Sequence, residues 1–385
     1  MRFMTAPMLA VATLTATFSP AQHTWAEEPD SQLRVSGDLR FRAEWDWDSR
    51  RANGAKRDDR GRARIRARIA VRIEPNDQFE FLTRFRTGSR ASQQSPHVTV
   101  ADFSGNPTGT QEVVIDKWYV KAKGKVAEAR AWLWGGRNSL PFWKQNELLW
   151  DDDVTPAGVA GGAEFDLRAG KLAVAAGYLL LPDGIDHFHG NGVPVQFAYS
   201  GGLEELQWHM AAGVLLIDGE PGARNLRMGN GARDYTIWNG SLQVVRKFLG
   251  VPAIFGADVY SNSEGYSAGE IARDFSAASG VGKDDTDGFV LSLRVKNLGN
   301  EGQWQLGYYY ADIEALAVHA SYAQDDWMRW GSSSQTDASD FKGHEFRVGW
   351  SPMKNWQLLA RLYTVEAQNS PQDGNRFRFD INWKF

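Results

Sequence analysis

The side chains best suited to chemistry in this sequence are a row of arginines. Residues 61–73 read GRARIRARIAVRI, with arginine at every second position from Arg62 to Arg72 except at Ala70. The residues between them are apolar. A guanidinium keeps its charge at any working pH and matches the geometry of carboxylates and phosphates. Such a row can therefore attract or hold anions.

A second group of polar side chains is acidic. The stretch GRNSLPFWKQNELLWDDDVTPAG (136–158) contains Glu147 followed by Asp151, Asp152 and Asp153. Three adjacent aspartates could accept hydrogen bonds in a turn, charge a narrow passage, or bind Ca²⁺. We favour the turn and the narrow passage over the ion, and we predict no metal site and no cofactor.

Enzymatic chemistry has little support. Of the seven histidines, only His187 and His189 cluster with acids, in DGIDHFHG (183–190). Alternating histidines could bind a metal, but a solvated loop is the simpler interpretation. The sequence has no G-x-S-x-G, H-E-x-x-H or glycine-rich phosphate loop. It also lacks the signals of a nucleic-acid-binding protein. We therefore predict neither an enzyme nor a nucleic-acid partner.

The arginines need a strand to hold them on one side. Successive side chains of a strand point to opposite faces, so the period of two in 61–73 gives one cationic and one apolar face. In a soluble sandwich the arginines would face water and the apolar residues a core. In a membrane barrel the apolar residues would face lipid and the arginines an aqueous lumen. The rest of the chain decides between them.

Composition narrows the class. The chain has 385 residues, 42% hydrophobic and 12% aromatic, with no cysteine. This excludes a disordered chain and a disulfide scaffold. No segment offers the ~18 consecutive apolar residues of a membrane-spanning helix. Residues 1–26 read as a signal peptide. They hold one of the 43 basic residues and no acid, so residues 27–385 carry 42 basic and 47 acidic residues, formally −5.

Alternation recurs along the whole of 27–385. It predicts sixteen strands, with the weakest pattern in the fourth and fifth. The predicted strands are 33–46, 60–74, 77–88, 111–122, 128–136, 159–168, 171–181, 193–201, 204–217, 233–247, 251–263, 286–298, 301–314, 342–351, 354–366 and 375–385.

The lengths of the connections sort by parity. Every second connection is tight, for example EPND, RAG and SPMKN. The others are long and lie near 47–59, 89–110, 137–158, 182–192, 218–232, 264–285, 315–341 and 367–374. Short turns on one rim and long loops on the other are typical of a bacterial outer-membrane barrel, as is an even number of strands. A soluble sandwich or other periplasmic β-protein gives no reason for this sorting.

Aromatic residues support the same architecture. With strand directions set by the connections, five aromatic residues fall near the short-turn end and two near the outer end. They are Trp304, Trp350, Trp356, Trp383 and Phe385, and then Trp45 and Trp47. Two aromatic belts are expected at the two interfaces of a bilayer. We predict an all-β, closed antiparallel transmembrane barrel of about 16 strands with both termini on the periplasmic side.

In this barrel the arginines must point inward, since a lipid-facing arginine near mid-bilayer costs roughly 2–4 kcal/mol. Closure places the last strand beside the first, so inward cations from five neighbouring strands form one surface, here called the arginine wall. It comprises Arg34, Arg40, Arg42, Arg62, Arg64, Arg66, Arg68, Arg72, Arg84, Arg86, Arg361, Arg376, Arg378 and Lys384. Inward acids such as Glu44 and Glu80 could pair with part of it, which leaves a structural interpretation open beside a functional one.

The third long connection should fold into the barrel. Leu140, Phe142, Trp143, Leu148, Leu149 and Trp150 make it too apolar for a loop in water. Inside the lumen it would narrow the passage. Its residues Trp143, Glu147, Asp151, Asp152 and Asp153 are predicted to form the constriction, with the carboxylates facing the arginine wall.

At this loop the sequence resembles a known family. The segments GRNSLPFW, NELLWDDD and TPAG are similar to the putative-porin family of Gram-negative outer membranes, relatives of the general porins and, more distantly, of the alginate-export barrel. The resemblance implies a porin but no particular solute. It also implies that Phe385, as a terminal aromatic residue, is read by the barrel-assembly machinery, and it suggests a homotrimer.

Two functions remain open. The first is a porin of the cell outer membrane that passes small hydrophilic, preferentially anionic solutes. Its predicted pore-lining residues are Arg40, Arg42, Arg62, Arg64, Arg66, Arg68, Arg84, Arg86, Arg376 and Arg378. The second is a barrel that exports or binds a polyanionic polysaccharide, as the alginate exporter does. Stable ion current would separate the porin from a conduit plugged by polymer.

Overall fold

A computed structural model describes residues 32–109, 111–227, 229–248, 250–275, 280–331 and 335–385. The predicted signal peptide, 1–26, lies outside these ranges.

The strands form one antiparallel sheet that closes on itself, because β1 pairs with β18 on one side and with β3 on the other. Sixteen strands make up the barrel: β1 (Gln32–Arg50), β3 (Arg60–Asn76), β4 (Phe79–Thr87), β6 (Val113–Val126), β7 (Ala129–Arg137), β8 (Ala157–Leu167), β9 (Gly170–Pro182), β10 (Phe188–Leu203), β11 (Leu206–Asp218), β12 (Tyr235–Phe248), β13 (Val251–Asn262), β14 (Asp287–Val295), β15 (Trp304–Ile313), β16 (Phe341–Trp350), β17 (Trp356–Ala367) and β18 (Asp373–Lys384).

Each of the sixteen predicted strands corresponds to one of these, including the two with weak alternation, which are β6 and β7. Two further short strands were not predicted. β2 (Lys56–Arg57) extends the β1 edge in the first long loop, and β5 (Val98–Asp102) pairs with β3 from within the second. Both lie in loops, where the sequence pattern has no clear period.

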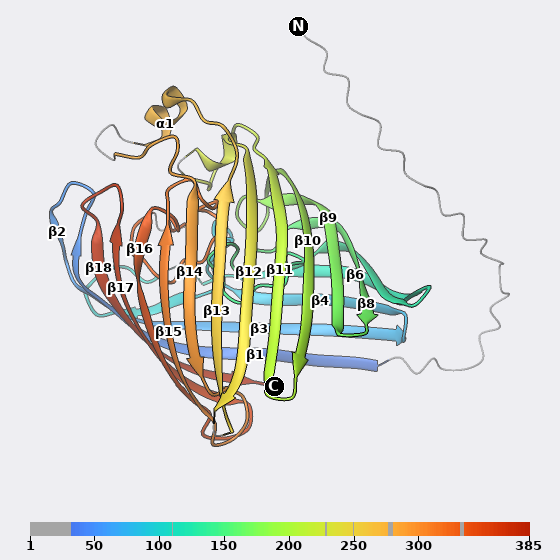
Figure 1. The fold of residues 1–385 in the computed structure, drawn as a ribbon. Coiled ribbons are helices and arrows are strands. Elements are labelled where there is room, and N and C mark those ends of the chain that lie inside the picture. Colours follow the sequence, from blue (N-terminus) through green and yellow to red (C-terminus); the bar gives the residue numbers. More distant parts are fainter. Residues whose placement is uncertain (1–31, 110, 228, 249, 276–279, 332–334) are drawn as a thin grey trace, which may run out of the picture.

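Loop length follows the predicted parity. Several tight turns have only two residues, as between β8 and β9, and most of the other connections are longer, although those after β9 and β17 have five residues each. Figure 1 shows strands β10 to β14 side by side, with long loops and the helix α1 (Ala268–Asp274) above their upper ends. The C-terminal strand ends at the opposite rim, where the Lys384 amide donates to the carbonyl of Asn355 in a short turn. A short 3₁₀ turn, η1 (Asn230–Ala232), lies in the loop before β12.

No helix in the described part of the chain is long and apolar enough to cross a membrane.

The two faces of β3 differ as the alternation requires. Ile69 and Ile73 on the outer face are each 44% exposed, as expected for side chains that face lipid. On the other face Arg66 is buried. The same division holds on β4, where Phe81 and Phe85 point outward and Arg86 is buried. The apolar band is therefore outside and the charge inside.

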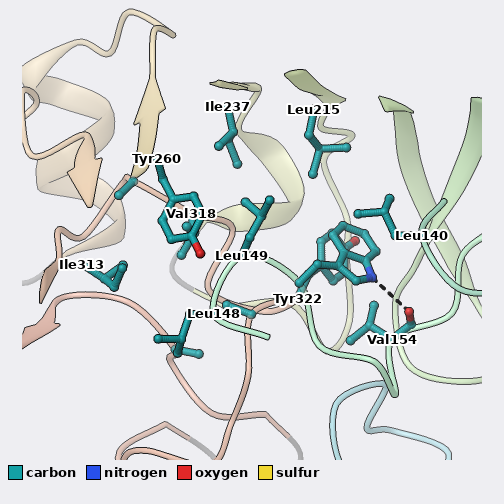
Figure 2. Close-up of a cluster of buried hydrophobic side chains, with 14 of the residues drawn as sticks. Leu140, Leu148, Leu149, Val154, Leu215, Ile237, Tyr260, Ile313, Val318 and Tyr322 are labelled. Carbon is teal, nitrogen blue, oxygen red and sulfur yellow. Dashed lines mark hydrogen bonds between the residues drawn. The ribbon is translucent and has the colours of Figure 1, made fainter. Parts of the chain in front are cut away.

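The interior also contains a hydrophobic core, which the prediction of a water-filled lumen did not include. Two loops form it, the third loop (138–156) and the seventh loop (314–340). Figure 2 shows Leu148 and Leu149 of the third loop beside Val318 and Tyr322 of the seventh. Inward side chains of the strands complete the cluster, including Leu179, Leu181, Leu215, Ile217, Ile237, Val290 and Ile313. Burial removes the apolar surface of these side chains from water, and each fully buried large side chain stabilises the fold by ~1.5–3 kcal/mol.

The inward fold of the third loop is therefore confirmed, but it is not alone. An inward fold was predicted for the third loop alone, and the seventh loop shares it. Its amide at Gln324 donates to the Glu147 carbonyl, and the Asp151 amide donates to the Tyr322 carbonyl. The Trp150 and Tyr322 rings lie 4.9 Å apart. The two loops thus hold each other inside the barrel.

Closure of the barrel generates a prediction at Gly37. The Gly37 amide donates to the Phe385 carbonyl at 3.0 Å, and the Phe385 amide donates back at 3.1 Å. A Cβ at Gly37 would lie 2.3 Å from the backbone oxygen of Arg68. Gly37→Val should therefore weaken the seam between β1 and the C-terminus. We expect a lower fraction of folded, heat-modifiable barrel by gel electrophoresis.

The matched control is Gly124→Val, because nothing lies within 4 Å of a Cβ at that strand position. It should fold as the wild type does. Equal folding of both variants would contradict the packing assigned to the seam.

Candidate functional site in the barrel lumen

The ten predicted pore-lining arginines come together on four neighbouring strands. The register places Arg40 opposite Arg66 and Arg42 opposite Arg64 across β1 and β3. β18 adds Arg376 and Arg378 on the other side of β1, and β4 adds Arg84 and Arg86 beyond β3. Like charges at such spacing repel one another, so other groups must compensate them.

Carboxylates on β1, on β18 and on the neighbouring β6 supply part of the compensation. Asp380 accepts two hydrogen bonds from Arg42, at 2.7 and 3.0 Å. Asp38 lies between Arg66 and Arg68, at 2.6 and 2.7 Å. The remaining pairs repeat this arrangement: Glu44 with Arg62 and Arg378, Asp46 with Arg376, and Asp116 with Arg84. These contacts support the structural interpretation for a large part of the wall.

The third loop spans the lumen from one side to the other. Gln145 donates to the Leu242 and Ala257 carbonyls of β12 and β13. At the other end Asp153 contacts Arg68 of β3 at 2.7 Å. Around the ring of sixteen, β3 and β12 lie eight strands apart in either direction, so they face each other across the lumen. The loop therefore divides the cross-section of the barrel.

Of the predicted constriction residues, only Asp153 pairs with the arginine wall. Trp143 turns away and stacks on His209 of β11, with 3.9 Å between the ring centres. Asp152 pairs with Lys144 at 2.7 Å and is largely exposed. Within the described ranges Glu147 and Asp151 make no ion pair. All four acids line the same cavity as Arg40, Arg66 and Arg68, so they face the arginine wall as predicted, but only Asp153 makes an ion pair with it.

Asp326 of the seventh loop joins those acids and makes more direct contacts with the arginine wall than any of them. Its carboxylate contacts Arg42 at 3.4 Å, Arg361 at 2.6 Å and also Arg378. Its backbone carbonyl accepts from Arg376 at 2.9 Å. One loop carboxylate thus joins β1, β17 and β18 from inside. Sequence reasoning missed this residue, although the aromatic content of the seventh loop gave the same signal that identified the third.

The arginines and carboxylates of this ion-pair network do not balance in number. Eleven arginines of the wall lie in this network, and seven carboxylates meet them, which leaves a formal excess of four positive charges. The arginines are Arg40, Arg42, Arg62, Arg64, Arg66, Arg68, Arg84, Arg86, Arg361, Arg376 and Arg378. The carboxylates are Asp38, Glu44, Asp46, Asp116, Asp153, Asp326 and Asp380.

The acids of the two loops differ in charge state because their neighbours differ. Burial opposes ionisation of Asp153, but Arg68 and Arg66 outweigh it and lower the pKa of Asp153. Arg378 and Arg361 likewise hold the pKa of Asp326 well below its usual range against the effect of burial. Burial, with the charge of Asp152, raises the pKa of Glu147 to about 7. Glu147 of the third loop therefore changes charge near neutral pH, as does Asp340 of the seventh loop, where burial raises the pKa to about 7.

The predicted alternatives with a metal gain no support. The described part of the chain contains no group of three or more histidines, aspartates or glutamates placed to hold a metal ion. His187 instead contacts Asp186 at 3.0 Å and Arg224 at 3.1 Å. Asp151 accepts from the Asp153 amide at 2.7 Å, as in the turn role considered for these aspartates.

Comparisons with known proteins agree with this geometry. Residues 50–182 match a family described as putative porin. The structure is similar to OprB of Pseudomonas putida, with TM-score 0.57 and 11% identity over 92% of this chain and 94% of that one. It is also similar to Salmonella typhi OmpF in complex with daunomycin, with TM-score 0.52 and 10% identity over 94% and 99%. A comparison with curated proteins found no match.

At such identities the two structures establish the shared fold alone. The family match confirms the resemblance drawn from the motifs of the third loop, which lies within residues 50–182. The family match and the barrel fold together support a porin of the outer membrane, and they favour a channel over an enzyme.

The pKa of Glu147 predicts a response to pH. Lowering the pH from 8 to 6 crosses its pKa of about 7, so Glu147 loses its negative charge and the lumen becomes more positive. The ratio of anion to cation permeability should rise, as read from the reversal potential in a KCl gradient. Glu147→Gln should show a smaller rise, and a ratio that falls on acidification would refute the assignment.

Asp326 predicts a second change in selectivity. Asp326→Asn removes a negative charge that three arginines share, so the excess of positive charge grows and the hold on the seventh loop weakens. Both anion preference and single-channel conductance should increase. Removing one partner of a buried ion pair also costs ~3–5 kcal/mol, so thermal unfolding should begin at a lower temperature.

Asp284→Asn is the control, because Asp284 is an exposed acid of an outer loop, 85% accessible at its side chain. It should leave selectivity and conductance unchanged. An Asp326→Asn channel with wild-type reversal potential would show that Asp326 does not set the charge of the lumen.

Proposed function

We propose that this protein is a porin through which small hydrophilic solutes diffuse passively across the outer membrane, with a preference for anions. The observation that carries the proposal is the ion-pair network of the wall, in which eleven arginines meet only seven carboxylates. Fixed guanidinium groups beside a narrow passage raise the local concentration of anions. The ion pairs keep the wall rigid, and the excess of arginines gives it a net positive charge.

The preference should depend on salt. The Debye length falls from ~10 Å at 0.1 M to ~3 Å at 1 M, so mobile ions screen the wall at high salt. The formal −4 of the whole chain does not oppose the proposal, since permeating ions respond to nearby charges.

The polysaccharide alternative finds less support. A polymer conduit needs an unobstructed lumen, whereas the third and seventh loops pack against each other and against both sides of this barrel. No second function is therefore proposed.

Three further features belong to the proposal. Residues 1–26 act as a signal peptide and 27–385 form the exported barrel. Phe385 is the residue that the barrel-assembly machinery reads. The barrels assemble as homotrimers, an expectation that rests on the resemblance to general porins.

The selectivity test removes two cations that face the third loop. In the double variant Arg66→Ser with Arg68→Ser, Asp38 and Asp153 lose their partners and turn the lumen toward negative charge. The anion-to-cation permeability ratio should fall roughly five-fold or more at low salt. Reversal potentials of purified protein in planar bilayers measure it.

A charge-balanced variant separates selectivity from misfolding. Adding Asp38→Asn and Asp153→Asn to the double variant removes two charges of each sign, so the ratio should return toward the wild-type value. Cation preference in the wild type, or an unchanged ratio in the double variant, would overturn the proposed anion preference.

A further inference from the structure

A cavity of about 300 Å³ lies between the arginine wall and the two loops. Its cations come from barrel strands, among them Arg40, Arg66, Arg361 and Lys384. Most of its carboxylates come from the third and seventh loops. The two signs therefore enter the cavity from different elements, and one side is mainly cationic while the other is mainly anionic.

Several of these charges already have partners. Arg66 and Arg68 share Asp38 and Asp153. Arg361 is held by Asp326 and Asp380, at 2.6 and 2.8 Å. These groups shape the cavity, but they have little capacity left for a solute.

Two cations on the strand side are not satisfied by carboxylates. The nearest carboxylate to Arg40 is Asp380, at 3.9 Å, and Asp380 already binds Arg42 and Arg361. The Nε of Arg40 donates to the Asn382 amide oxygen at 2.6 Å, so its terminal nitrogens remain available. Among the described residues Lys384 makes no ion pair.

Three carboxylates on the loop side likewise make no ion pair within the described ranges. Asp325 has neither a hydrogen bond nor an ion pair to any residue in the described ranges. Glu147 and Asp151 each accept only a backbone amide, from Asp152 and Asp153. Burial raises the pKa of Asp325 and of Asp151, and the charges of Asp326 and Glu147 respectively raise it further; Arg378, Arg64 and Arg42 lower the pKa of Asp325 but do not outweigh these causes.

We infer that this cavity binds small zwitterions of the α-amino-acid type, with the carboxylate toward Arg40 and the ammonium group toward Asp325 and Glu147. Charges in a partly buried site are stable only when they are paired. A halide would satisfy the strand side alone and a metal cation the loop side alone. A molecule with both charges satisfies both sides at once.

The size of the cavity agrees with this class of ligand. Small-molecule sites begin at about 300 Å³, which leaves room for an amino acid rather than a long polymer. The inference rests on the proposed porin function, since the cavity is part of the same passage. It adds the class of solute that binds in this passage.

The test is block of ion current by L-alanine in planar bilayers. Alanine bound in the passage should reduce the conductance of the wild-type channel along a saturating curve. Glycerol, which is of similar size and uncharged, should not do so. Sodium lactate and ethylammonium chloride, which each carry one of the two charges, should block only at concentrations at least ten-fold higher.

Variants locate the site. Arg40→Gln and Asp325→Asn should each raise the half-blocking concentration of alanine at least ten-fold. Lys283→Gln, at an exposed outer-loop position, should leave it unchanged. Absence of alanine block in a conducting wild-type channel, or equal block by lactate, would overturn the inference. Absence of any ion current would overturn the proposed porin itself.

Discussion

The rest of the structure depends on the burial of two loops inside the barrel. The third and seventh loops carry large apolar side chains, such as Leu148, Trp150, Val318 and Trp327, that water would not accommodate. Strands β9, β11, β12, β14 and β15 contribute inward leucines, isoleucines or valines to the same cluster. The loops are therefore held by the same hydrophobic effect that stabilises a soluble core. The position of the two loops determines which of their carboxylates can reach the arginines of the barrel wall.

The charged side of the lumen follows from this packing. With one half of the inner wall occupied by the apolar cluster, the arginines of β17, β18, β1, β3 and β4 face the loops across the remaining space. Asp153 and Asp326 reach them because the backbones that carry them are anchored by apolar neighbours. Buried ion pairs contribute little net stability compared with apolar packing, but they fix geometry. The ion pairs of the arginines set the shape, and the positive charge that the carboxylates leave uncompensated is available to solutes.

Most of the fold could be predicted from the sequence, because both the period of two and the parity of loop lengths are local signals. The inward arginines followed from the cost of placing them in lipid. The partners in the lumen could not be predicted, since Asp326 meets Arg42 across 284 residues of sequence. A partial signal existed: the runs YLLL (178–181) and VLLI (214–217) are apolar on both faces, which indicates strands buried on both sides.

The central claim is that the seventh loop lies inside the barrel, and labelling tests it most directly because the chain has no cysteine. Val318 is fully buried in the loop, whereas Phe103 of the second loop is 68% exposed. On intact cells a membrane-impermeant maleimide should label Phe103→Cys and leave Val318→Cys unlabelled until the protein is denatured. Equal labelling of the two variants before denaturation would place the seventh loop outside and contradict this account.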